Sequence, residues 1–173
     1  MDTKKLNDNL IKNLYSNNDN IVLGAIKEIS ESGNSNYLPG LIELLNSHES
    51  EEIKNQIIKI LTEIKHTNAV PFLAQAIEEK KYHGIQETLV RVCWENGLDY
   101  TNYFSIFIDL LINGEYMVAF EAYTVIDNSE GTISKASSQE YIARLKDALA
   151  SVGEERQTLL HHIIQMLPGL VKA

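Results

Sequence analysis

A fixed interval of 32 residues separates two pairs of similar segments, and this period constrains the fold more than any other feature. The apolar segment 25–29 (AIKEI) returns at 57–61 (IIKIL), and the segment 38–41 (LPGL) returns at 70–73 (VPFL). Repeats of this length are typical of helical hairpins that stack, because one hairpin cannot bury its apolar face alone. The period therefore predicts an all-α solenoid.

Apolar spacing and turn residues predict where the helices lie. In the first repeat a helix is expected from about 19 to 32, where Gly33 ends it, and a second begins near Tyr37 with Pro39 in its first turn. We expect a single domain over 1–173. It would comprise a capping helix in 1–18, repeats at 19–49, 50–82, 83–114 and 115–151, and a capping helix in 152–173. The polar segment 127–139 is predicted to be the longest loop.

Charge and composition narrow the classes of function. The net charge is −9, which disfavours nucleic-acid binding because that role normally needs a basic surface. No apolar run approaches the roughly 18 residues of a membrane helix, and the N-terminal segment lacks the apolar core of a signal peptide. The one cysteine, Cys93, cannot form an intramolecular disulfide. We therefore expect a cytoplasmic, monomeric protein that does not bind membranes.

These segments resemble HEAT repeats, the helical hairpins of the armadillo-like superfamily. The resemblance covers about 19–126 and rests on the apolar pattern of each first helix, the turn, and the Leu-Pro or Val-Pro start of the second helix. It implies a right-handed α-α superhelix of about four hairpins, whose second helices line a concave binding face. The family consists mostly of scaffolds and protein-binding adaptors. A minority bind nucleic acid, or act on DNA bases or tetrapyrrole groups.

Aligning the predicted second helices identifies outward positions on that implied concave face. Glu43, Gln75 and Asp109 form one row, and Glu78 belongs to a second row. Such a face should be acidic to neutral and should suit a basic or polar partner. The alternative interpretation is that these are ordinary polar positions on exposed helices.

The chain departs from its own repeat between Val92 and Ser134. This stretch contains seven acidic residues and no Lys or Arg, and eight of the thirteen aromatic residues lie within 94–123. Trp94 occupies a position that is polar in the other repeats, so it either anchors a partner or packs at a repeat junction. The less constrained aromatic residues are Tyr100, Tyr103, Phe104 and Tyr116. Aromatic rings beside acids predict recognition of an Arg- or Lys-rich peptide.

No motif predicts catalysis, a metal site or a cofactor. The sequence has no GxSxG elbow, P-loop, GxGxxG, HExxH or CxxC pattern. Cys93 aligns with core positions, and His83 with Glu87 supplies only two possible metal ligands. The serines of 127–139 are either phosphorylation sites or part of a flexible insertion.

Together these features predict a non-enzymatic adaptor or scaffold. It would present an acidic, partly aromatic concave surface to a protein or a basic peptide. The alternative is a HEAT-like lyase or chaperone-type protein that acts on a bound chromophore or protein substrate.

Overall fold

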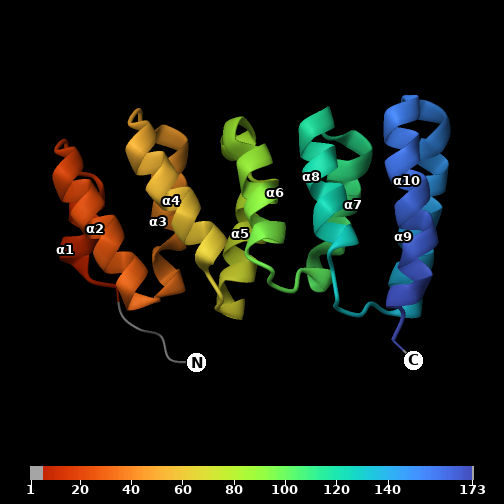
Figure 1. Cartoon of the computed structure of the whole chain (residues 1–173), viewed down its shortest axis with the longest axis horizontal. Helices are drawn as coiled ribbons and strands as arrows, with labels where there is room; N and C mark the ends of the chain where they lie inside the picture. The colour runs from red at the N-terminus through yellow and green to blue at the C-terminus, as the bar shows by residue number, and fades with distance from the viewer. Residues whose placement is uncertain (1–5, 173) are drawn as a thin grey trace. The chain divides into compact units, whose positions relative to one another are not determined.

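The computed structural model describes residues 6–172, and within that range the fold is all-α, as the sequence predicts (Figure 1). Ten α-helices follow one another in this part of the chain, and short 3-10 helices precede several of them. The helices are α1 (Asp8–Leu14), α2 (Asp19–Ser32), α3 (Leu38–Ser47), α4 (Glu51–Glu63), α5 (Val70–Glu78), α6 (Gln86–Glu95), α7 (Phe104–Asn113), α8 (Tyr116–Asp127), α9 (Lys135–Ala148) and α10 (Glu154–Met166).

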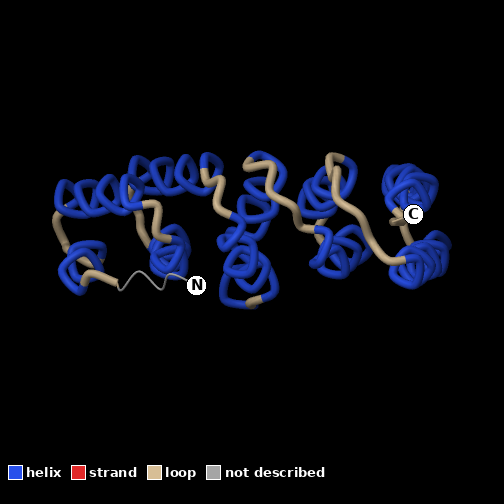
Figure 2. The backbone as a smooth tube through the Cα atoms, turned by 90° about the horizontal axis from the view of Figure 1, so that it is seen from below, coloured by secondary structure: helices blue, strands red, loops and turns tan. Residues whose placement is uncertain are grey.

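The helices form two compact units whose boundary lies between Asn96 and Gly97. Unit 1 contains α1–α6, and unit 2 contains α7–α10. In unit 1, α2, α4 and α6 pack in one layer and α1, α3 and α5 in a second (Figure 2); in unit 2, α8 contacts α10 and α7 contacts α9. Each unit is therefore a short all-α solenoid. The expectation of one domain over 1–173, with the repeat boundaries given above, stays a prediction.

Helical spacing of apolar residues is the local cause of this packing. On α2 the buried residues are Val22, Ala25, Ile26 and Ile29. On α4 they are Ile53, Ile57 and Leu61. Each of these stripes faces the interior of unit 1, and burying one Leu or Ile side chain contributes about 1.5–3 kcal/mol. The helix predicted from 19 to 32 is confirmed, because α2 ends where Gly33 adopts a left-handed φ of 61°.

The loop between α8 and α9 is shorter than the predicted 127–139. It spans 128–134, because Ser134 caps α9 by accepting a hydrogen bond of 3.0 Å from the Ser137 N–H. Ile133 anchors the loop: its N–H donates to the Leu170 carbonyl at 2.9 Å, and its carbonyl accepts from the Lys172 N–H at 3.2 Å. Residues 135–139 of the predicted loop therefore belong to α9.

Two glycines near α2 give a matched pair of substitutions with opposite expected effects. Gly24 lies inside the helix, and a Cβ there would meet nothing within 4 Å, so Gly24→Ala should raise the free energy of unfolding by about 0.5–1 kcal/mol. Gly33→Ala should lower it by about 1 kcal/mol, because its φ is left-handed and the new Cβ would lie 3.2 Å from His66 Nε2. Urea unfolding measures both shifts. Shifts of the same sign would contradict the role of Gly33 as the helix terminus.

Candidate functional site

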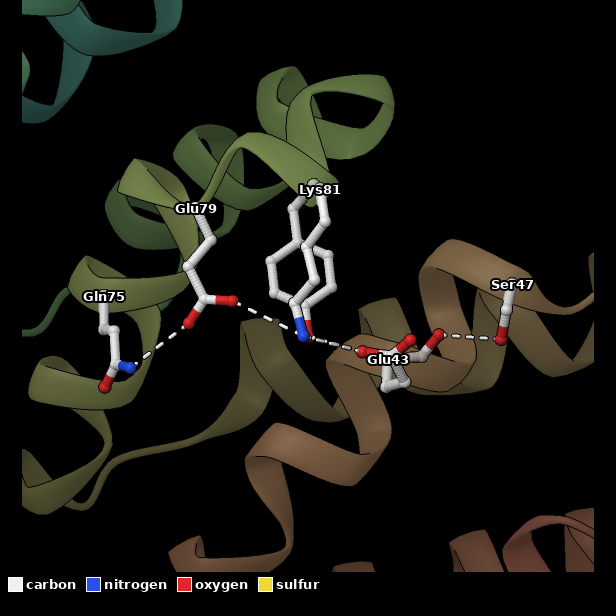
Figure 3. Close-up of polar contacts among 6 residues, drawn as sticks. Glu43, Ser47, Gln75, Glu79 and Lys81 are labelled. Carbon is white, nitrogen blue, oxygen red and sulfur yellow. Dashed lines mark hydrogen bonds and ion pairs between the residues drawn. The ribbon is translucent and has the colours of Figure 1, made fainter.

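In unit 1 the predicted acidic row is largely paired within the protein (Figure 3). The Glu43 carboxylate on α3 accepts hydrogen bonds from Lys81 Nζ at 3.0 Å and from the Tyr82 hydroxyl at 2.8 Å. Lys81 also lies 3.4 Å from a Glu79 oxygen, and Glu79 accepts a hydrogen bond from Gln75. Glu43 is therefore a poor candidate for binding a basic partner, because it already has Lys81 as an ion-pair partner.

The same contacts change the ionisation of Glu43. Hydrogen bonds from Lys81 and then from Tyr82 lower the pKa of the Glu43 carboxyl below its usual value. The Tyr82 ring is buried, and burial raises the pKa of its hydroxyl. Tyr82 therefore remains protonated and able to donate to Glu43, which joins α3 to the 3-10 turn Lys80–Ile85 that precedes α6.

In unit 2 the predicted acid Asp109 is also paired. It lies on α7, and Arg144 from α9 forms an ion pair with its carboxylate. The same guanidinium donates to the Ser105 hydroxyl at 3.1 Å and lies 3.7 Å from Glu140. Although 92–134 contains no Lys or Arg, α9 thus supplies a cation to this surface. Asp109, like Glu43, is therefore a poor candidate for binding a basic partner.

Two of the five aromatic candidates are core residues. Tyr100 and Phe104 are buried, and the Tyr100 ring packs edge-on against Phe107 with centroids 5.8 Å apart. Their assignment as partner-binding residues is therefore wrong in this conformation, because neither ring reaches the surface. Tyr103 and Trp94 are half-buried, and Cys93 is buried in the core as its alignment predicts.

The remaining aromatic candidate, Tyr116, belongs to an exposed apolar face on α8. Tyr116, Met117 and Phe120 are 46%, 48% and 41% exposed. Residues 116 and 120 are one helical turn apart, so these side chains lie on one side of the helix. Met117 and Phe120 were not among the predicted site residues.

The helices α2, α4 and α8 are each the first helix of a helical hairpin, and comparing these three indicates that the fold does not require apolar residues at the start of α8. The helices α2, α4 and α8 begin at Asp19, Glu51 and Tyr116, so these three residues hold equivalent positions. An acid in the first turn of a helix interacts favourably with the helix dipole. The first turns of α2 and α4 contain acids, whereas the first turn of α8 contains none. This internal comparison is the signal by which the α8 face could have been found from the sequence.

A hollow of about 740 Å³ lies beside Tyr116, between the start of α8 and the start of α10. Tyr116 and the acids Glu154 and Glu155 line it, together with Ile112 and Arg156. Arg156 keeps its positive charge but forms no ion pair with these acids; its guanidinium donates instead to the carbonyls of Ile112 and Gly114, both at 2.7 Å. Among residues 6–172, neither glutamate has a cationic partner within ion-pair distance.

A polar group at the other end of α8 connects this helix to α10. The His162 Nε2 atom lies 3.2 Å from Asp127, and its Nδ1 atom lies 3.0 Å from the Tyr123 hydroxyl. A neutral imidazole satisfies both contacts when its proton is on Nε2. The Tyr123 ring is also 6.1 Å from Phe120 and 5.6 Å from the His162 ring. The aromatic surface thus extends from α8 onto α10.

Residues 6–172 contain no group of three His, Cys, Asp or Glu side chains that could hold a metal ion. None of the helices in this range is both long enough and apolar enough to span a membrane.

The comparison with protein families identifies the class of protein. The model for HEAT repeats matches residues 7–93, which is half of the chain. The chain therefore belongs to the HEAT-repeat family, as the repeat pattern predicts. Members of this family are commonly scaffolds for protein interactions and are typically not enzymes. A comparison with curated proteins finds no match.

The lowered pKa of Glu43 predicts a pH-dependent contribution to stability. A carboxyl whose pKa is lower in the folded state stabilises the fold above its unfolded pKa of about 4.3, and this contribution is lost as the pH falls through the folded value. Glu43→Gln should therefore lower Tm by up to about 2–4 °C at neutral pH. At pH values below the folded pKa, the variant and the parent should melt at the same temperature.

Thermal unfolding across the acidic range measures this difference, with Glu78→Gln as the control. Glu78 is exposed on the neighbouring helix α5 and forms no ion pair in the described structure. A pH dependence that is the same for both variants would show that Lys81 and Tyr82 do not hold Glu43 in its ionised form.

Proposed function

We propose that this protein is a non-enzymatic adaptor that binds a basic segment of another protein at the hollow between α8 and α10. The observation that carries the proposal is that an exposed ring, Tyr116, and two acids, Glu154 and Glu155, line one hollow. Membership of the HEAT-repeat family supports a protein partner. The hollow replaces the predicted concave row as the best candidate site, because Glu43 and Asp109 are already paired.

The chemistry of the hollow suits a Lys or Arg side chain. A cation over the face of a Tyr ring gains about 0.5–1 kcal/mol at an exposed site, and more when it is desolvated. The two carboxylates supply ion-pair partners and also steer a basic segment toward the site. The hydrogen bonds of Arg156 to the carbonyls of Ile112 and Gly114 fix the start of α10 beside the end of α7, and with its one positive charge the two carboxylates still leave the hollow acidic.

Selection of displayed random peptides on the full chain tests this proposal. The enriched peptides should contain Arg or Lys, and Tyr116→Ala should weaken their binding by about tenfold or more. The double variant Glu154→Gln/Glu155→Gln should also weaken binding and should reduce its dependence on salt, because it removes two charges that attract the peptide.

The first turn of α4 provides a matched control. It also carries two adjacent acids, so Glu51→Gln/Glu52→Gln removes the same charge from the same helical positions in unit 1. This control should leave peptide binding unchanged. Enrichment of acidic or uncharged peptides, or equal losses in the two double variants, would contradict the proposed site.

A further inference from the structure

The exposed apolar face of α8 extends beyond the hollow and has acidic groups at both of its ends. Met117 and Phe120 lie in the middle, and the Tyr123 ring broadens the face toward α10. Glu154 and Glu155 flank the end at Tyr116, and Asp127 lies at the other end. Residues 116 and 127 are separated by three helical turns, so they lie on the same side of α8, about 16 Å apart.

We infer that the partner segment is an amphipathic helix with apolar residues at its centre and a basic residue near each end, and that it lies along α8. This inference rests on the proposed function and specifies the partner of the same site. One basic end would occupy the hollow beside Tyr116, the apolar centre would cover Met117 and Phe120, and the other basic end would reach Asp127.

Backbone hydrogen bonding favours a helix over an extended segment. The backbone groups within α8 are already paired inside the helix, so α8 offers no free edge on which a strand could add. An extended peptide over Met117 and Phe120 would leave its own N–H and C=O groups without partners against an apolar surface. A helix satisfies these groups internally and packs its side chains between those of α8.

The charges select this occupant over a second copy of the chain or a lipid surface. Glu154 and Glu155 outnumber Arg156 at one end and Asp127 contacts a histidine, not a Lys or Arg, at the other, so a second copy would place acid against acid in either orientation. An anionic membrane surface would be repelled for the same reason. A helix with a basic residue at each end complements the acids, and apolar residues between them match the exposed centre.

The experiment uses displayed random peptides of about 18 residues, long enough to span the face as a helix. Enriched sequences should carry apolar residues at helical spacing between two basic residues about 11 positions apart. Met117→Ser/Phe120→Ser should weaken the binding of a selected peptide about tenfold or more, and Asp127→Asn should weaken it several-fold. Proline at the centre of the peptide should abolish binding, because it breaks a helix.

Ile21→Ser is the matched control, because Ile21 is 44% exposed on α2 in unit 1. It should leave binding unchanged. If Tyr116→Ala weakens binding but Met117→Ser/Phe120→Ser, Asp127→Asn and central proline do not, the proposed function stands and the helix along α8 is excluded. Enriched peptides that bind in an extended form also exclude it. The helix along α8 is also excluded if the parent chain forms a dimer that Met117→Ser/Phe120→Ser abolishes. The same holds if the parent chain adsorbs to phosphatidylserine vesicles and this double variant does not.

Discussion

Burial of one apolar stripe on each helix is the interaction on which the rest of the structure depends. The stripes of α2 and α4 are buried in unit 1. In unit 2 the buried apolar residues include Phe107, Leu111 and Leu145. A repeat protein gains its stability from such burial within hairpins and between neighbouring hairpins. The outward side of a helix contributes little to this burial, so its residues can change without loss of the fold.

Because outward residues are free to change, the apolar residues on the outward side of α8 indicate a role other than folding. On α2 and α4 the first turn is acidic, which suits both solvent and the helix dipole. On α8 the same turn carries Tyr116 and Met117, and Phe120 follows one turn later. These residues leave a large part of their apolar surface in water, and binding a partner would remove that surface from water. The site is therefore proposed where the chain departs from its own structural repeat.

Much of the fold was predictable from local pattern, whereas much of the site was not. The period and the positions of Gly33 and Pro39 predicted α2 and the start of α3, because these signals act within a few residues. The pairing of Glu43 with Lys81 joins residues 38 positions apart, and that of Asp109 with Arg144 joins residues 35 apart. Aligning the outward positions of the second helices compares residues of like position only, so it did not reveal these cations.

Tyr100 and Phe104 stand at helix starts, where the apolar pattern did not distinguish an exposed ring from one folded into the core. The cap at Ser134 lies within a run of polar residues, and polar residues are common both in loops and at helix starts.

The most direct test of the central claim is amide chemical-shift mapping of the full chain during titration with a basic peptide selected for binding. The shifted resonances should cluster on the outward side of α8, around Tyr116 and Phe120, and on the first turn of α10. Resonances from the first turns of α2 and α4 should not move, because those positions have the same place in the repeat but are acidic and lack the aromatic face. Shifts centred on α2 and α4, or on the row of Glu43 and Gln75, would contradict the account.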